Sequence, residues 1–199
     1  MRIVGGRLRG RVLKAPASRD IRPTSERLRE SIFDILVHAY GDPVAGARVI
    51  DLFAGSGALG LEALSRGAGF ALFVDNGAEA RALLRANIET LGLGGATRVW
   101  RADAMRLGLA PAAYSLAFLD PPYGKKLAAP ALATLVQGGW LAPGAIVVVE
   151  EAARVAIAAP EALRLAEERV YGDTKIAILI MEGTSDAVLP REAGEGDRA

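Results

Sequence analysis

The sequence predicts an α/β fold with a mostly parallel sheet. Between residues 47 and 150, short apolar runs suited to buried strands alternate with longer segments of helical periodicity, a rhythm typical of parallel sheets with helices on both faces. Gly55-Ser56-Gly57 joins the first such run directly to a helical segment. The end of the chain breaks the rhythm, because residues 163–171 and 174–182 are strand-like runs separated only by Gly172-Asp173. We therefore expect seven strands, the last two forming an antiparallel hairpin.

Local patterns predict the elements in order. Leu28, Ile32, Ile35 and Leu36 recur at helical spacing and predict a helix over residues 25–40, which ends at the Gly41-Asp42-Pro43 turn. Apolar runs predict the earlier strands at residues 49–53, 70–74, 98–101, 115–119 and 145–150. Helical periodicity predicts intervening helices at residues 58–65, 78–91 and 127–136.

The two ends of the chain differ from its middle. A chain of 199 residues suits one domain with a small appendage. Residues 1–22 contain two short extended pieces around Gly5-Gly6 and Gly10, which predict a small hairpin. Residues 23–183 then form the α/β domain. Residues 184–199 are polar without periodicity, which predicts a disordered tail.

The net charge of +1 hides a strong asymmetry. Residues 1–30 hold nine Lys or Arg and three Asp or Glu, a net +6, which leaves −5 for the remainder. A basic extension on a mildly acidic body favours binding to a polyanion such as RNA, and a solvated charged face is the alternative. The candidate phosphate contacts are Arg7, Arg9, Arg11, Lys14, Arg19 and Arg22.

The composition also excludes several classes of site. There is no cysteine, and His38 is the single histidine, so a thiolate nucleophile is excluded and we expect no metal site. No apolar run approaches the roughly 18 residues of a membrane span. The first residues, Met1-Arg2-Ile3-Val4, lack the apolar region of a signal peptide. We therefore expect a cytoplasmic protein that does not bind membranes.

Four acids, Asp51, Asp75, Asp103 and Asp120, follow or end four successive predicted strands. The carboxyl ends of parallel strands meet at one edge of the sheet, where ligands of open α/β sheets bind. An acid at the end of the second strand is suited to ribose hydroxyls, and one after the third to an adenine amino group. Each alone has a second interpretation as a helix cap, but four caps in a row are a poor explanation.

The most informative of these acids opens Asp120-Pro121-Pro122-Tyr123. The two prolines stiffen the turn and donate no hydrogen bonds. A carboxylate, nearby carbonyls and an aromatic ring suit a flat substrate that carries an NH2 group, which describes a nucleobase. The alternative is a tight turn with a capping Asp and a buried Tyr.

A glycine turn lies upstream in the run of residues 49–60. Its glycines allow close approach of the backbone to a ligand beside a helix N-terminus. Gly55, Gly57 and Gly60 also match a dinucleotide-binding fingerprint. A dehydrogenase therefore remains an alternative, supported by these three glycines alone. The carboxylate of Asp51 beside this loop suits a ligand bearing an ammonium group better than a pyrophosphate.

In these residues the chain resembles the bacterial RsmD family. The blocks that carry the resemblance are residues 3–10, 22–30, 51–57 and 120–124, and it extends from Arg2 to about Gly183. The resemblance implies a Rossmann-like class I methyltransferase fold that uses S-adenosyl-L-methionine. It further implies methylation of the exocyclic N2 amine of one guanine in 16S ribosomal RNA, free or within the small ribosomal subunit, by a monomer.

The resemblance also implies roles for individual residues. The expected catalytic residues are Asp120, Pro121 and Tyr123. The expected cofactor-binding residues are Thr24, Asp51, Phe53, Ala54, Gly55, Ser56, Gly57, Asp75, Asp103 and Ala104. Two alternatives remain at this point. Adenine-N6 methylation of DNA or RNA uses the same tetrapeptide, and an RNA-binding or ribosome-binding factor without activity would use only the basic extension.

Overall fold

The computed structural model describes residues 1–15 and 25–183. Thr24, Arg19 and Arg22, and the tail predicted at 184–199, lie outside these residues. Within the described ranges, no helix is both long and apolar enough to cross a membrane.

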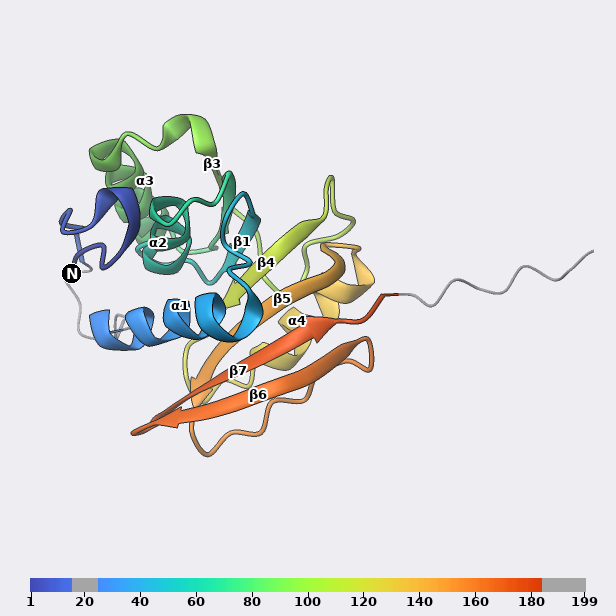
Figure 1. Ribbon diagram of the computed structural model, residues 1–199. Coiled ribbons are helices and arrows are strands. Elements are labelled where there is room, and N and C mark those ends of the chain that lie inside the picture. Colours follow the sequence, from blue (N-terminus) through green and yellow to red (C-terminus); the bar gives the residue numbers. More distant parts are fainter. Residues whose placement is uncertain (16–24, 184–199) are drawn as a thin grey trace, which may run out of the picture.

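A seven-stranded sheet with the strand order β3-β2-β1-β4-β5-β7-β6 forms the centre of the fold (Figure 1). Strands β1 to β5 pair in parallel, whereas β7 pairs antiparallel with both β5 and β6. The predicted α/β class, with a parallel sheet that finishes in an antiparallel hairpin, is thereby confirmed. The strands are β1 Arg48–Leu52, β2 Phe70–Val74, β3 Thr97–Trp100, β4 Tyr114–Leu119, β5 Leu141–Ala152, β6 Leu163–Tyr171 and β7 Thr174–Met181.

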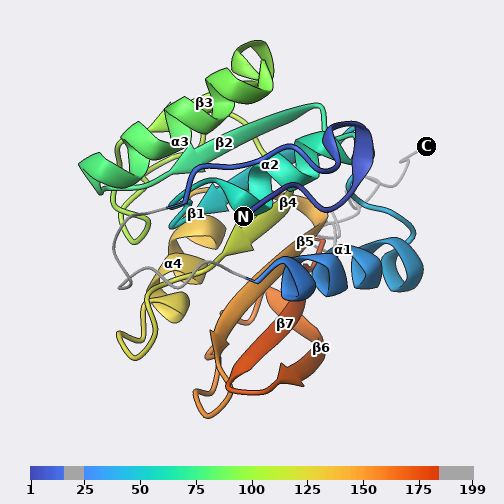
Figure 2. The same ribbon diagram turned by 90° about the vertical axis from the view of Figure 1, so that its left-hand side faces the viewer.

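The helices cover both faces of the sheet (Figures 1 and 2). They are α1 Glu26–Tyr40, α2 Ala58–Ser65, α3 Ala78–Leu91 and α4 Ala128–Gln137, with short 3-10 turns η1 Gly6–Leu8 and η2 Gly94–Ala96. Alternate strand residues point to opposite faces, so the core divides in two. Phe73 and Phe118 pack with α1, α2 and α3, whereas Leu52 and Leu119 pack with α4.

Local signals explain where the first helix begins and ends. The hydroxyl of Ser25 accepts a hydrogen bond from the Leu28 N–H at 3.1 Å, as an N-cap does. Gly41 ends the helix in the left-handed conformation, with φ 68°. Both boundaries agree with the sequence prediction.

Strand β5 is the main departure from the predicted boundaries. It begins at Leu141, four residues before the predicted start. Leu141 pairs with Tyr114, and the register then shifts before Leu116 pairs with Ile146. The Pro143-Gly144 dipeptide interrupts the apolar pattern there, which hides the early pairing in the sequence.

The N-terminal segment, residues 1–15, is docked on the domain (Figure 2). It doubles back on itself through an isolated antiparallel bridge between Arg2 and Val12, with η1 at its tip. Ile3 and Leu13 are buried in the same core as α1 and α2. The segment therefore contributes apolar side chains to the domain core.

Polar side chains of α2 hold the tip of this segment. Glu62, with no exposed surface, accepts hydrogen bonds from the N–H groups of Val4 and Gly5 at 2.9 and 2.7 Å. Its carboxylate also pairs with Arg66 at 2.8 Å and with the buried Arg29 at 3.6 Å. Burial lowers the pKa of Arg29, and the carboxylate of Glu62 counteracts that effect. This buried network joins α1, α2 and the N-terminal segment.

Candidate active site

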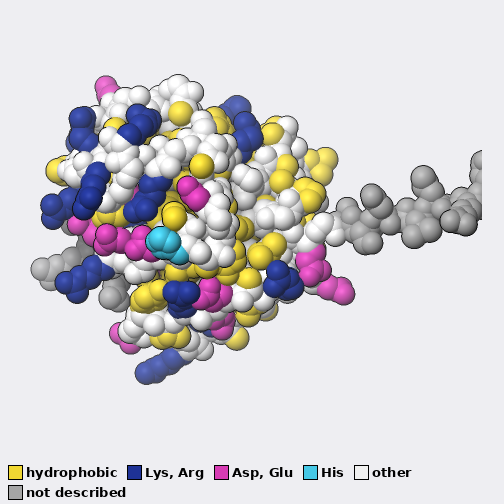
Figure 3. Space-filling model, in the orientation of Figure 1, with side chains coloured by type: hydrophobic (Ala, Val, Ile, Leu, Met, Phe, Trp, Pro, Cys, Tyr) yellow, Lys and Arg dark blue, Asp and Glu magenta, His cyan; other side chains and the backbone are white. Residues whose placement is uncertain are grey.

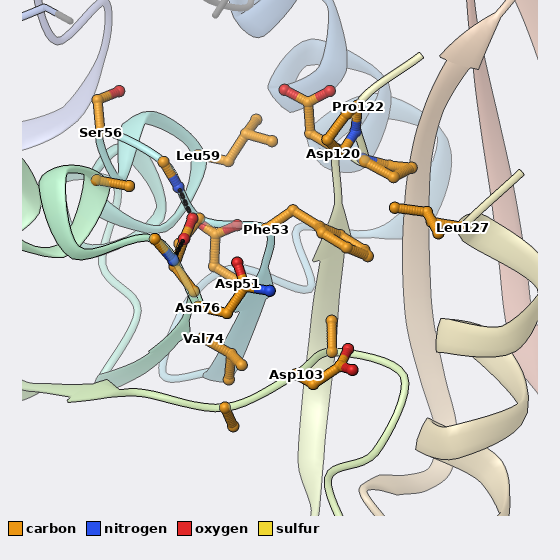
Figure 4. A pocket seen from close by; sticks show the side chains of 18 of the residues that line it. Asp51, Phe53, Ser56, Leu59, Val74, Asn76, Asp103, Asp120, Pro122 and Leu127 are labelled. Atoms are coloured by element: carbon orange, nitrogen blue, oxygen red, sulfur yellow. Dashed lines mark hydrogen bonds between the residues drawn. The ribbon is translucent and has the colours of Figure 1, made fainter. Parts of the chain in front are cut away.

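A pocket of about 790 Å³ opens at the carboxyl ends of the parallel strands. Its volume lies within the usual range for small-molecule and cofactor sites. Figure 4 places Asp120 at one end and Asp103 at the other, with the side chain of Phe53 reaching between them. The pocket therefore lies where the sequence predicted a ligand site.

The loop after β1 has an unusual backbone. Phe53 adopts φ 60° although it is not glycine, and Gly55 and Gly57 adopt φ 55° and 81°. A left-handed conformation in a bulky residue costs about 1–3 kcal/mol and often marks a ligand site. A Cβ added at Gly57 would lie 2.3 Å from the side chain of Leu84. Gly57 thus shapes the loop and the start of α2, and it is not among the residues that line the pocket.

Asp75 holds this loop in place. One carboxylate oxygen accepts the Gly55 N–H at 2.9 Å, and the other accepts the Gly77 N–H at 2.7 Å. The side chain therefore fixes the glycine loop against the turn that follows β2. Each oxygen keeps a second lone pair that could accept a further hydrogen bond.

Asp51 is buried beneath the same loop, with 2% of its surface exposed. It accepts the Gly60 N–H at 3.0 Å. Burial, reinforced by the charge of Asp75, raises the pKa of Asp51 to about 8, although the Gly60 hydrogen bond acts in the opposite direction. A cation in the pocket would favour the ionised carboxylate.

Asp103 begins a turn after β3. One of its carboxylate oxygens accepts the Met105 N–H at 3.0 Å, and its carbonyl accepts the Arg106 N–H. Asp103 therefore caps the turn, as the alternative interpretation expected, and it also lines the pocket together with Ala104.

At the opposite end, the turn 120–123 brings Asp120 and Tyr123 to the pocket. The hydroxyl of Tyr123 donates to Oε1 of Glu150 at 2.7 Å and lies 3.0 Å from Oγ1 of Thr174. Burial raises the pKa of Tyr123, and Glu150 adds to that shift. The phenol therefore stays protonated and can donate at neutral pH.

Glu150 is a pocket residue that the sequence reasoning missed. The signal was present, because Glu150 ends the predicted fifth strand just as Asp120 follows the fourth. Sequence inspection also overlooked Asn76, Lys125 and Leu127 in the pocket wall; these residues carry no motif of their own.

The pocket brings together most of the predicted site. Of the expected cofactor-binding and catalytic residues, the following line it: Asp51, Phe53, Ala54, Gly55, Ser56, Asp75, Asp103, Ala104, Asp120, Pro121 and Tyr123. Gly57 is not among the lining residues, and Thr24 lies outside the described residues.

A basic surface covers the N-terminal segment. Arg7, Arg9, Arg11 and Lys14 are exposed, and Figure 3 shows Lys and Arg side chains gathered over the part of the molecule formed by η1, α2 and α3. The Arg11 guanidinium donates to the carbonyl of Thr90 on α3 at 3.1 Å, which draws it onto the domain. Residues 1–15 contain no acid, so the positive charge there is not balanced within the segment.

A family model described as Conserved hypothetical protein 95 matches residues 1–180. Ribosomal RNA small subunit methyltransferase D of Escherichia coli strain K12 is 37% identical over 191 residues, which cover 94% of each chain. The chain belongs to the RsmD family. The resemblance inferred from the four sequence blocks is thereby confirmed.

Further relatives agree with this membership. The small subunit methyltransferase D of Haemophilus influenzae is 31% identical over 176 residues, 86% of this chain and 89% of the relative. The structure of the Escherichia coli protein yhhF is 34% identical with a TM-score of 0.79, covering 92% of this chain and 98% of that chain. An RNA methyltransferase from Salinibacter ruber in complex with S-adenosyl-L-homocysteine, 13% identical with a TM-score of 0.63, shares the fold and covers 87% of this chain and all of that chain.

Proposed function

We propose that the chain is an S-adenosyl-L-methionine-dependent methyltransferase that methylates the exocyclic N2 amine of a guanine in 16S ribosomal RNA. The observation that carries the proposal is the row of acids along one pocket. Asp51, Asp75, Asp103 and Asp120 all line it; the first three would form its cofactor end and Asp120 its substrate end. Membership of the RsmD family points to ribosomal RNA.

The residues present fit the cofactor. Asp51 would face its ammonium or sulfonium charge, Asp75 its ribose hydroxyls and Asp103 its adenine amine. The strained loop of Phe53, with Ala54, Gly55 and Ser56, would let its methionyl part lie close to the backbone. The cofactor supplies an activated methyl group, so the protein mainly has to position the amine.

Asp120 and the carbonyl of Pro121 would do this positioning. By accepting the two N–H bonds of the amine, they turn its lone pair toward the methyl group. A bound cofactor would supply the methyl group and keep the electron pair of its S–C bond, and the carboxylate of Asp120 would stabilise the positive charge that develops on the amine nitrogen. The extra proton then leaves the nitrogen, with Asp120 as the adjacent acceptor. The ring of Tyr123 would stack on the base.

The basic surface defined by Arg7, Arg9, Arg11 and Lys14 would bind the RNA backbone. A target base must leave any stack to enter the pocket, as in other base-modifying enzymes. Side chains cannot read the deep major groove of paired RNA, so we propose a guanine splayed from a loop. The substrate is 16S ribosomal RNA held by small-subunit proteins, and the enzyme acts as a monomer in the cytoplasm.

Adenine-N6 methylation remains the second candidate, because an adenine amine would meet the same acceptors at Asp120. Labelled methyl transfer to undermodified small subunits, to naked 16S RNA and to duplex DNA, followed by nucleoside mass spectrometry, separates the two. We expect N2-methylguanosine from ribosomal RNA. Label that elutes as N6-methyladenosine, or efficient labelling of duplex DNA, would support the alternative.

A further inference from the structure

The hydroxyl of Tyr123 is tied to two strands outside its own turn. It donates to Glu150 on β5 and contacts Thr174 at the start of β7. Tyr123 as a residue is 37% exposed, whereas Glu150 and Thr174 are only 5% and 6% exposed. A partly exposed aromatic side chain at the pocket mouth is therefore anchored to two buried polar groups.

The sheet register explains why these groups can meet. Leu119 pairs with Val149 in the parallel ladder of β4 and β5, so Asp120 and Glu150 occupy the next positions on neighbouring strands. Thr174 pairs with Ala152 where the antiparallel hairpin begins. The carboxyl end of β5 thus brings the hairpin to the same edge as the parallel strands.

The turn that carries Tyr123 needs such an anchor. Neither Pro121 nor Pro122 has an N–H to donate. The segment from Pro122 to Lys126 is exposed, and Gly124 and Lys126 adopt φ 75° and 54°. A side-chain hydroxyl that reaches the sheet can restrict the ring where backbone donors are missing.

We propose that Glu150 and Thr174 are positioning residues that hold the ring of Tyr123 against the target base, which makes the β6–β7 hairpin part of the substrate site. This inference rests on the proposed base methylation. The two residues act through Tyr123, so their effects depend on its hydroxyl. A hydrogen bond between a hydroxyl and a carboxylate, in a pocket that must exclude water, preorganises the ring before the base enters.

A double-mutant cycle on kcat, at saturating RNA and cofactor, tests the proposal. Tyr123→Phe keeps the ring and removes the hydroxyl, and we expect it and Glu150→Ala each to lower kcat about tenfold, as loss of one charge-assisted hydrogen bond does. The double variant should be no slower than the slower single variant. Glu150→Gln keeps an oxygen acceptor and should recover most of the rate. Affinity for S-adenosyl-L-homocysteine should stay the same throughout.

The chain offers a matched control. The hydroxyl of Tyr40 on α1 lies 3.3 Å from Glu167 on β6, another tyrosine–glutamate pair on the hairpin, but neither residue lines the pocket. Tyr40→Phe should leave kcat unchanged. If Glu150→Ala does not fold, Thr174→Val serves in its place, with a loss of about threefold that disappears in the Tyr123→Phe background.

Different outcomes would contradict the proposed methylation and the positioning role of Glu150 and Thr174. Wild-type protein that transfers no methyl group to ribosomal RNA overturns the proposed function. Wild-type protein that is active, combined with an unchanged kcat for Tyr123→Phe or with losses that multiply in the double variant, overturns the positioning role of Glu150 and Thr174 alone.

Discussion

Cofactor binding should release a proton from Asp51. Burial holds the pKa of this carboxyl at about 8 in the free protein, so about nine-tenths of the molecules carry the proton at pH 7. An opposite charge within about 4–6 Å lowers the pKa of a carboxyl by about 1–3 units. With a bound pKa near 6, the middle of that range, binding releases about 0.8 proton at pH 7 and about 0.1 at pH 5 or pH 9. Affinity should rise about 100-fold across the same interval, because two pKa units correspond to about 2.7 kcal/mol.

Titration calorimetry with S-adenosyl-L-methionine, which carries both the ammonium and the sulfonium charge, measures this release directly. The binding enthalpy at pH 7 is compared in phosphate and Tris, two buffers that differ in ionisation enthalpy, and the slope gives the number of protons. Asp51→Asn is the control, since it removes the titrating group with little change in shape. A binding enthalpy that does not depend on the buffer, or the same slope for Asp51→Asn, would mean that Asp51 releases no proton on binding.

The same carboxyl affects folding stability in the absence of ligand. Its pKa in the folded state exceeds the ordinary value of 3.8, so the folded protein binds the proton more tightly than the unfolded chain. The contribution of Asp51 to the free energy of unfolding is therefore complete below pH 3.8. It declines by up to about 1.4 kcal/mol per pH unit until about pH 8. Urea denaturation from pH 5 to pH 8 should show a steeper loss for wild type than for Asp51→Asn.

Four further predictions concern separate parts of the molecule. Asp75→Asn leaves one backbone N–H of the loop without its acceptor and should weaken S-adenosyl-L-homocysteine binding about 10- to 100-fold by calorimetry. Asp120→Ala should lower kcat by about 10²–10³ with little change in that affinity. Arg7→Gln with Arg9→Gln should reduce the salt slope of RNA binding by about 1.4 in filter-binding assays, or about 0.7 per lost phosphate contact. Glu62→Gln should lower the free energy of unfolding by about 3–5 kcal/mol in urea, since it removes the negative charge from a buried network that includes Arg29 and Arg66.

Each of these has a control or a contrary outcome. Arg164→Gln removes an exposed cation from the edge strand β6 and should leave the salt slope unchanged. If it lowers the salt slope as much per residue as the Arg7 and Arg9 substitutions do, RNA binding depends on overall charge and not on the basic surface of the N-terminal segment. If folded Asp120→Ala turns over normally, Asp120 shapes the turn but takes no part in catalysis. A loss below 1 kcal/mol for Glu62→Gln would mean that water replaces the carboxylate. Unchanged affinity in Asp75→Asn would argue against a role for the loop in binding.

Substitution tests the N-terminal segment better than deletion does. Removing residues 1–22 would expose the core around Ile3 and Leu13 and leave Glu62 without two backbone donors. Lost RNA binding would then be indistinguishable from damage to the domain. The exposed guanidiniums can be changed while the buried contacts stay intact.

Local patterns in the sequence predict most of the elements and one edge of the site. Helix α1 follows from the spacing of its apolar residues between Ser25 and Gly41, because periodicity and caps are local properties. The acids at strand ends could be assigned to one edge because parallel strands align their carboxyl ends. The glycine loop was visible for the same reason, as it lies directly between a strand and a helix.

Contacts between residues far apart in the chain become visible only in the packed fold. Tyr123 contacts residues 27 and 51 positions away, and Glu62 binds the backbone of Val4, 58 positions earlier in the chain. Both oxygens of Asp75 are engaged by backbone N–H groups, one of them from a loop 20 residues away. These pairings depend on sheet register and on how the N-terminal segment docks. Each is a single polar contact between distant residues, so it leaves no periodic pattern in the sequence.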